Sequence, residues 1–99
     1  MSTVITHMAQ EGAIYVSESE MARRIRQVSA GSSVEQVTEL LGGAPFQSRE
    51  DQEGLKVYWR FSLPDRVPPF PQVELYMGIF VDGALTFGSI LPHASGGAN

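Results

Sequence analysis

Three carboxylates lie close together in the segment FQSREDQEG, where their spacing could support chemistry. Glu50, Asp51 and Glu53 could ligate a hard cation or act as an acid–base pair, provided that rigid elements made them converge. The segment is polar, however, and it ends at Gly54, which is typical of the turn of a β-hairpin. We therefore predict an exposed turn here and no metal or catalytic site.

The other residues that could carry chemistry are isolated or absent. His7 and His93 lie near opposite ends of the chain and lack the spacing of a zinc site. The chain has no cysteine, which excludes disulfides, thiolate ligands and a cysteine nucleophile. It also has no glycine-rich phosphate loop and no G-x-S-x-G nucleophile motif. We therefore expect a non-enzymatic protein with no catalytic, cofactor-binding or metal-binding residues.

The composition suits one small folded domain, with 99 residues of which 42% are hydrophobic and 18% are charged. The net charge of −4 argues against binding to a nucleic-acid backbone. No run approaches the ~20 apolar residues of a membrane-spanning helix, and no secretory signal precedes Arg23. We expect a cytoplasmic protein if the chain is full length. We expect a periplasmic or outer-membrane-associated one if a signal and lipobox were removed.

Two amphipathic segments predict the helices that position the rest of the chain. Residues 18–29 place apolar side chains on one face, and three arginines occupy the rest of the circumference. These arginines form either a patch for an acidic partner or an ordinary solvated face. The second helix follows Gly31. Ser33 is its candidate N-cap, although Ser32 offers the same cap one residue earlier, and Gly42 suits its C-terminal end.

Runs of apolar residues, alternating with polar ones or apolar on both faces, predict three strands, which are Leu55–Leu63, Val73–Val81 and Ala84–Leu91. The dipeptide Asp82-Gly83 predicts a two-residue type I′ turn between the last two. That turn would set Phe80 opposite Leu85 and Gly78 opposite Phe87.

These elements predict an α+β fold in which two short N-terminal helices pack on one face of a three- to four-stranded antiparallel sheet. Ala13–Val16 is either a short strand or an extended lead-in to the first helix. We place the domain at residues 18–92, preceded by an N-terminal arm at 1–17 and followed by a tail at 93–99.

Two helices can cover only one face of a small sheet, so the other face is either solvated or a contact surface. The proline-rich loop 64–71 presents Phe70 either to a partner or back over the core edge. We predict binding of a protein partner, or self-association as a homodimer, through this face and loop. The residues that we predict as contacts are Tyr58, Arg60, Phe70, Tyr76, Phe80 and Phe87.

Three stretches resemble one known family. Gly31–Val37 (GSSVEQV), then Leu40–Gly42 (LLG) and Pro45, resembles the G-M-[ST]-x-x-[QE]-V-x-x-L-L-G-x-P signature of the SmpA/OmlA family. Its members are small BamE-like lipoproteins of the outer-membrane β-barrel assembly machine. The strand Val57–Phe61 is similar to the family's W-x-Y strand, and Phe80–Leu85 is similar to its F-x-x-G-x-[VL] hairpin.

The chain departs from that signature in three respects. Ser32 stands where the family usually has methionine, the turn before Pro45 has one extra residue, and the lipobox cysteine is missing. The resemblance implies an α+β domain like one repeat of the β-lactamase inhibitor protein. It also implies a non-catalytic scaffold or partner-binding role, in a fold that can self-associate. The alternatives are an enzyme inhibitor of that fold and a small-ligand-binding domain with a pocket between helices and sheet.

Overall fold

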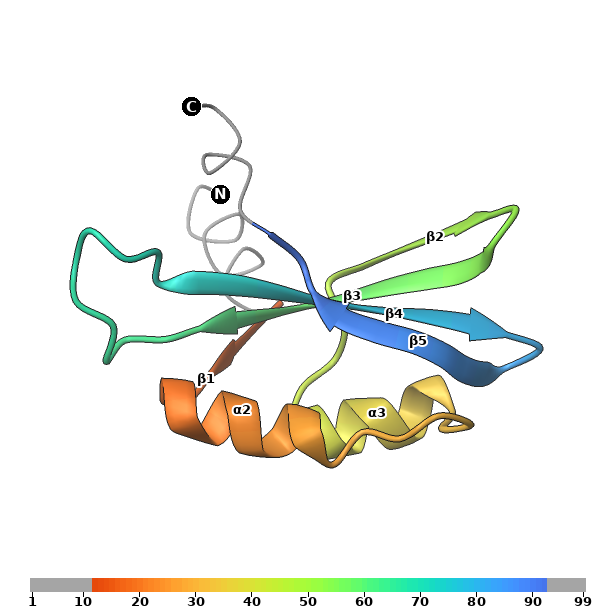
Figure 1. Cartoon of the computed structure of the whole chain (residues 1–99), viewed down its shortest axis with the longest axis horizontal. Helices are drawn as coiled ribbons and strands as arrows, with labels where there is room; N and C mark the ends of the chain where they lie inside the picture. Colours follow the sequence, from red (N-terminus) through yellow and green to blue (C-terminus); the bar gives the residue numbers. More distant parts are fainter. Residues whose placement is uncertain (1–11, 93–99) are drawn as a thin grey trace, which may run out of the picture.

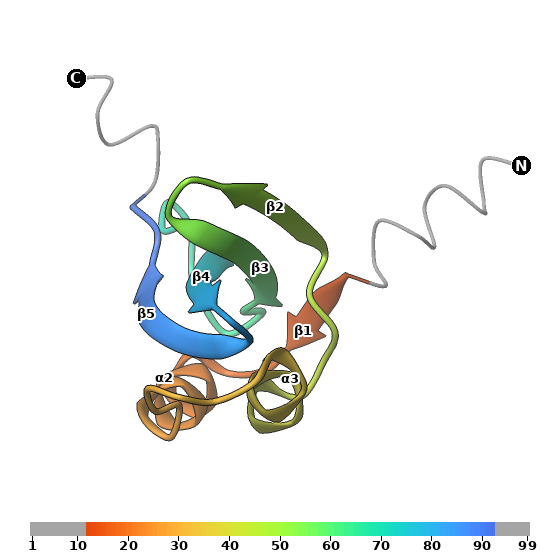
Figure 2. The ribbon, with the colours of Figure 1, turned by 90° about the vertical axis from the view of Figure 1, so that its right-hand side faces the viewer.

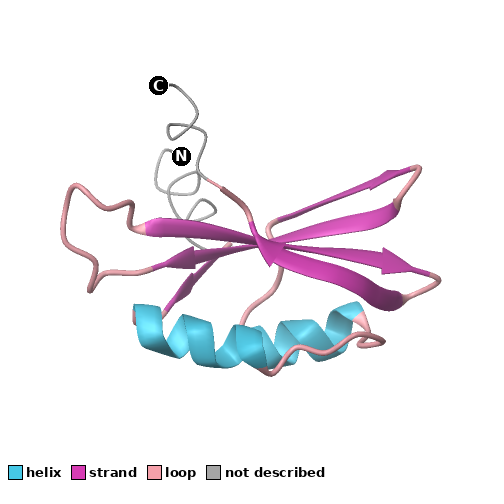
Figure 3. Cartoon of the chain, viewed as in Figure 1, coloured by secondary structure: helices cyan, strands magenta, loops and turns pink. Residues whose placement is uncertain are grey.

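The computed structural model describes residues 12–92. His7, His93, the tail and most of the predicted arm therefore lie outside the described residues. Within them, two helices form one layer and a five-stranded sheet forms the other (Figures 1 and 3). The elements in chain order are β1 (Ala13–Tyr15), α2 (Glu18–Arg26), α3 (Val34–Leu41), β2 (Gln47–Asp51), β3 (Gly54–Ser62), β4 (Val73–Val81) and β5 (Ala84–Ile90).

The sheet is mixed. β3 pairs antiparallel with β4, and β4 pairs antiparallel with β5. On the other side of β3, β2 pairs antiparallel with residues 54–58 and β1 pairs parallel with residues 60–62. Figure 2 shows β1 and β2 sharing this side of β3. The prediction of a three- to four-stranded antiparallel sheet is therefore wrong, because the sheet has five strands and one parallel pair.

The two added strands have no periodic signal in the sequence. β1 is three residues long, too short to show alternation, and it lies in the stretch left open as a strand or a lead-in. It belongs to the sheet although our predicted domain begins at residue 18. All five side chains of β2 are exposed, so this strand has no apolar row to identify it. Its pairing with β3 comes from the backbone, because a tight turn returns the chain at Gly54.

Local sequence signals determine the helix ends. Ser33 accepts a hydrogen bond from the Gln36 N–H, and the Gln36 side chain accepts one from the Ser33 N–H. This reciprocal capping box confirms Ser33 as the N-cap of α3 and excludes the alternative at Ser32. Gly42 ends α3 with a φ of 92°, which a residue without a Cβ adopts at little cost. α2 ends at Arg26, three residues before the predicted end.

The core lies between the helices and one face of the sheet. Trp59 is at its centre, fully buried, with its ring 6.2 Å from Tyr76 and 6.3 Å from Phe80. The helices contribute Met21 and Val37, which are also buried. The sheet face that carries Trp59 is therefore the covered face. Val57 and Phe61 on β3, and Tyr76 and Phe80 on β4, point to the same face and are buried with it.

The hairpin between β4 and β5 differs from the prediction at one pair. Asp82 and Gly83 have φ values of 52° and 80°, as a type I′ turn requires, and Phe80 pairs with Leu85 as expected. A β-bulge follows, so Phe87 pairs with Ile79 and not with Gly78. The prediction of Gly78 opposite Phe87 is therefore wrong. The inserted residue reverses the direction of every later side chain on β5.

Candidate functional site

The sheet face away from the helices carries a row of apolar side chains. We call it the open face, because both helices lie on the other side of the sheet (Figure 2). The row runs along β4 and comprises Val73, Leu75, Met77, Ile79 and Val81. Its two end residues are exposed and the middle three are half-buried. The exposed Phe87 pairs with Ile79 and adds an aromatic ring beside the row.

Polar side chains of β3 border this apolar row. Tyr58 pairs with Met77 and Arg60 pairs with Leu75, so both side chains stand next to the row on the same face. The Arg60 guanidinium lies 4.7 Å from the centroid of the Phe46 ring. This cation–π contact places the charged group over an aromatic ring at the border of the row.

A groove of about 640 Å³ opens where the start of β4 meets the end of β5. It is lined by Phe46, Arg60, Pro71, Gln72, Val73, Leu75, Leu91 and Pro92. Arg60 is the one charged group among the described residues that line it. The groove can therefore accept an apolar group and place a carboxylate beside it.

The carboxylates near Gly54 form a structural ion-pair cluster. Lys56 Nζ lies 2.9 Å from a carboxylate oxygen of Asp51 and 2.9 Å from one of Glu53. Hydrogen bonding by Lys56 lowers the pKa of Asp51, and the same bond raises the pKa of Lys56. Within residues 12–92, no group of three or more His, Cys, Asp or Glu side chains could hold a metal ion. The cluster thus ties the β2–β3 turn together.

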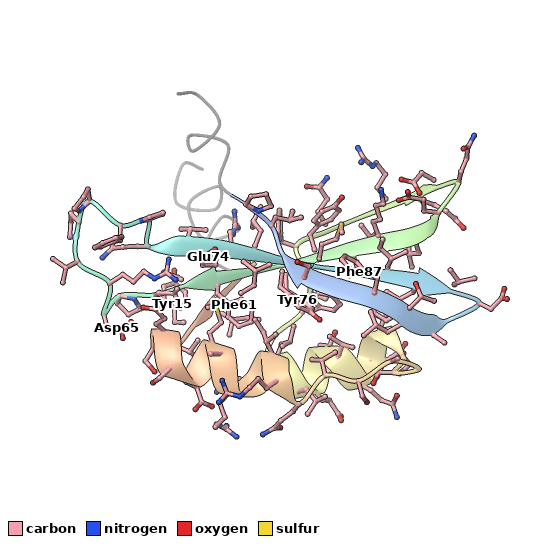
Figure 4. All side chains as sticks on the ribbon, viewed as in Figure 1. Tyr15, Phe61, Asp65, Glu74, Tyr76 and Phe87 are labelled. Carbon is pink, nitrogen blue, oxygen red and sulfur yellow. The ribbon has the colours of Figure 1, made fainter. Side chains whose placement is uncertain are left out.

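The proline-rich loop leaves Phe70 exposed while its other side chains anchor it to the domain. Asp65 accepts hydrogen bonds from the Glu18 N–H at 3.1 and 3.3 Å, at the start of α2. Arg66 reaches Glu74 on β4 at 2.6 Å and Glu18 at 3.1 Å. Figure 4 shows Asp65 and Glu74 at the end of the sheet nearest this loop. Phe70 therefore projects from a loop that Asp65 and Arg66 anchor to α2 and β4.

Two of the predicted contact residues are not on the surface. Tyr76 and Phe80 are 3% and 2% exposed and pack on Trp59 beneath the sheet. The reason is register, because Tyr76 pairs with Trp59 and therefore shares its face. The prediction of Tyr76 and Phe80 as partner contacts is wrong for the folded domain.

The structure brings together Tyr58, Arg60 and Phe87 on the open face, and places Phe70 on the loop beyond it. Sequence reasoning missed the apolar row of β4 as a surface feature. Because β4 is apolar on both faces, its pattern alone could not show which side the helices cover.

No helix within residues 12–92 has both the length and the apolar character needed to cross a membrane. Comparison with known proteins identifies no relative, because no family model, curated protein or solved structure matches the chain.

Proposed function

We propose that this protein is a non-catalytic module that binds a partner protein through its open face. The observation that carries the proposal is the apolar row of β4, which neither α2 nor α3 covers and which polar residues of β3 border. Apolar patches with polar rims are typical of protein interaction sites. The resemblance to the SmpA/OmlA family supports the same role, since it implies partner binding.

The chemistry of the surface indicates what the partner presents. The groove accepts apolar side chains between Val73 and Leu91, and Arg60 stands at its border. A guanidinium pairs with a carboxylate through two parallel hydrogen bonds. The contact with the Phe46 ring holds the Arg60 guanidinium at the border of the groove. We therefore propose a partner with an apolar strip flanked by an Asp or Glu side chain.

The two alternatives differ in what supports them. An enzyme inhibitor would use the same open face, so an enzyme is one kind of partner that the experiment below can identify. A small-ligand-binding domain needs space between helices and sheet. Leu41, Trp59 and Phe61 are fully buried there and fill the centre of that space. A groove of about 440 Å³ lies at its margin, between β5 and the end of α2, and no charged side chain lines it.

Site-specific crosslinking tests the proposal. A photoreactive amino acid replaces Val73 on the open face and, as the matched control, Gln27 at the exposed end of α2. We expect a partner crosslinked from position 73 and not from position 27. The purified partner is then titrated calorimetrically against Val73→Asp and Gln27→Asp, each of which adds one carboxylate. Val73→Asp should raise the dissociation constant by about tenfold or more, and Gln27→Asp should leave it unchanged.

The opposite pattern would overturn the open-face assignment. That pattern is crosslinking from position 27 alone, or an affinity for the purified partner that Val73→Asp leaves unchanged. Arg60→Glu provides a further test of the partner's charge. It should weaken binding more than Arg60→Gln does, because it places a carboxylate against the proposed carboxylate of the partner.

A further inference from the structure

A groove opens at the outer edge of the sheet, between β5 and the end of α2. It has a volume of about 440 Å³, and Figure 2 shows α2 beneath β5. Ile25 and Val28 line it from the helix side, and Leu85 and Ile90 line it from β5. None of the described residues that line it is charged. We call this space the edge groove. Its volume lies within the range of about 300–1,000 Å³ that is typical of small-molecule sites.

The connection between the two helices bounds the edge groove at the start of β5. The Gly31 N–H donates to the Leu85 carbonyl at 2.8 Å, and the Leu85 N–H donates to the Ser32 carbonyl at 2.8 Å. Beyond Leu85, β5 is the last strand on its side of the sheet, and within residues 12–92 no further strand pairs with it there. A ligand can therefore enter the groove from this free edge.

The side chain of Tyr76 reaches the edge groove from inside the domain. Tyr76 is only 3% exposed, and its ring lies 6.2 Å from that of Trp59. From β4 it extends beneath β5, where its hydroxyl lies so close to Gly88 that a Cβ at that position would collide with it. Both Tyr76 and Gly88 line the groove. The hydroxyl is therefore held at the wall of the groove by a ring that is fixed in the core.

Among the described residues, the Tyr76 hydroxyl has no hydrogen-bond partner. Burial alone raises the pKa of Tyr76, and no hydrogen bond contributes to that shift. The hydroxyl therefore keeps its proton at neutral pH and can act as a donor. Buried tyrosine hydroxyls usually have a partner, because an unpaired polar group is costly to hold away from water. A free donor at the wall of an apolar groove indicates a ligand that carries an acceptor.

We propose that the edge groove binds a small neutral ligand that has an apolar body and one carbonyl oxygen. The Tyr76 hydroxyl donates a hydrogen bond to that oxygen, and Ile25, Val28 and Ile90 contact the apolar body. An ionised group would lose its hydration in this groove without gaining a partner of opposite charge, so the ligand is neutral. A carbonyl oxygen accepts a hydrogen bond without bringing a donor of its own that needs a partner. The site is separate from the open face and does not rest on the proposed function.

Acetophenone and ethylbenzene are a matched pair of probes, because they differ only in a carbonyl group that replaces a methylene. Nuclear magnetic resonance titration measures both dissociation constants from the amide signals of Val28, Gly88 and Ile90. Acetophenone should bind the wild-type chain with a dissociation constant of about 1 mM, given its small size. Tyr76→Phe should raise this constant about three- to tenfold, because it removes one hydrogen bond. It should change the constant for ethylbenzene by less than about twofold, because the ring that lines the groove is retained.

Tyr58→Phe is the matched control. It removes the same hydroxyl from a tyrosine of β3 that lies on the open face, so both dissociation constants should stay as in the wild type. Nuclear Overhauser contacts in the wild-type chain give a second measurement that needs no variant. Protons of bound acetophenone should contact the ring of Tyr76 and the methyl groups of Ile25 and Ile90. If Tyr76→Phe fails to fold by circular dichroism, these contacts decide alone.

Three results would overturn the proposal. The first is that acetophenone at up to about 10 mM leaves the amide signals of Val28, Gly88 and Ile90 unshifted. The second is that Tyr76→Phe leaves the constant for acetophenone unchanged, or changes the constants for both probes alike. The third is that the Gly88 and Ile90 signals shift when the ligand-free chain is diluted, which would assign this edge to a second copy.

Discussion

Replacing Arg66 by methionine should destabilise the domain by about 3 kcal/mol. Arg66 extends from the proline-rich loop into the domain, where its Nη1 lies 2.6 Å from Glu74 Oε2 and 2.9 Å from the Pro71 carbonyl oxygen. Its Nη2 lies 3.1 Å from Glu18 Oε2. The side chains of Arg66 and Glu74 are only 15% and 10% exposed. The substitution therefore removes the cation from a carboxylate that is held away from water.

The magnitude follows from the two ion pairs. Breaking a buried pair by removing one partner costs about 3–5 kcal/mol, because the remaining charge is uncompensated. The pair with Glu18 is exposed on the Glu18 side and contributes below about 1 kcal/mol. Besides its pair with Arg66, Glu74 has a further interaction, so its charge is not left wholly uncompensated. We therefore expect a loss of stability at the lower end of this range. A loss of this size is large against the roughly 5–15 kcal/mol of a typical domain.

A second substitution separates charge from shape. Glu74→Leu, combined with Arg66→Met, removes the carboxylate that the single variant leaves uncompensated. The double variant should recover most of the lost stability, since apolar replacements of buried ion pairs are often neutral. Arg49→Met is the control, because Arg49 is exposed on β2 and its replacement should change stability by less than about 0.5 kcal/mol.

Urea unfolding at pH 7, followed by circular dichroism, measures all four chains. The midpoint should fall in Arg66→Met while the slope stays constant, which would show that the folded state is otherwise retained. The reasoning would be refuted if Arg66→Met lost less than about 1 kcal/mol. It would also be refuted if the double variant were as unstable as the single one, because the cost would then come from packing and not from the buried charge.

Two further predictions concern the helices. Ser33→Ala should lower the free energy of unfolding in urea by about 1 kcal/mol, because it removes the N-cap of α3. Ser32→Ala, one residue earlier, should lower it by less than about 0.5 kcal/mol. Equal losses in the two variants would contradict the assignment of Ser33 as the cap. Hydrogen bonds from Arg23, and next from Arg24, lower the pKa of Glu20 from 4.5 to about 2. Because the folded pKa is the lower one, this stabilisation is complete above pH 4.5 and is lost as the pH falls towards 2. Stability measured against pH should therefore fall less steeply across this window in Glu20→Gln, and an unchanged slope would show that Glu20 is not the group responsible.

The parts of the fold that the sequence predicts are those determined by local chemistry. The serine before α3, the glycine after it and Asp82-Gly83 all act within a few residues, and each lies where its pattern indicated. β1 and β2 could not be predicted in this way. β1 pairs with residues of β3 that are distant in the chain. Neither β1 nor β2 has alternating apolar residues that would identify it as a strand.

The candidate surface was predicted only in part, because the two faces of β4 are both apolar. Alternation separates Tyr76 and Phe80 from the row that contains Leu75 and Met77, but it does not say which set the helices cover. That choice follows from the pairing of Tyr76 with Trp59, which is a long-range contact. Tyr58 and Arg60 were placed correctly beside the open face because the alternation of β3 is unambiguous.

The side chains that β5 presents on its two faces depend on the bulge at Thr86. Without the inserted residue, regular pairing from the turn would point Phe87 towards the helices and Gly88 towards the open face. The groove beside α2 would then contain an aromatic ring, and the apolar row of β4 would lose its neighbour. The inserted residue instead places Phe87 on the open face and leaves a glycine above Tyr76 at the free edge. The Thr86 hydroxyl donates to the Ile79 carbonyl at 3.0 Å, which ties the bulge to β4. One backbone irregularity thus separates an aromatic ring on the open face from a glycine at the edge of β5.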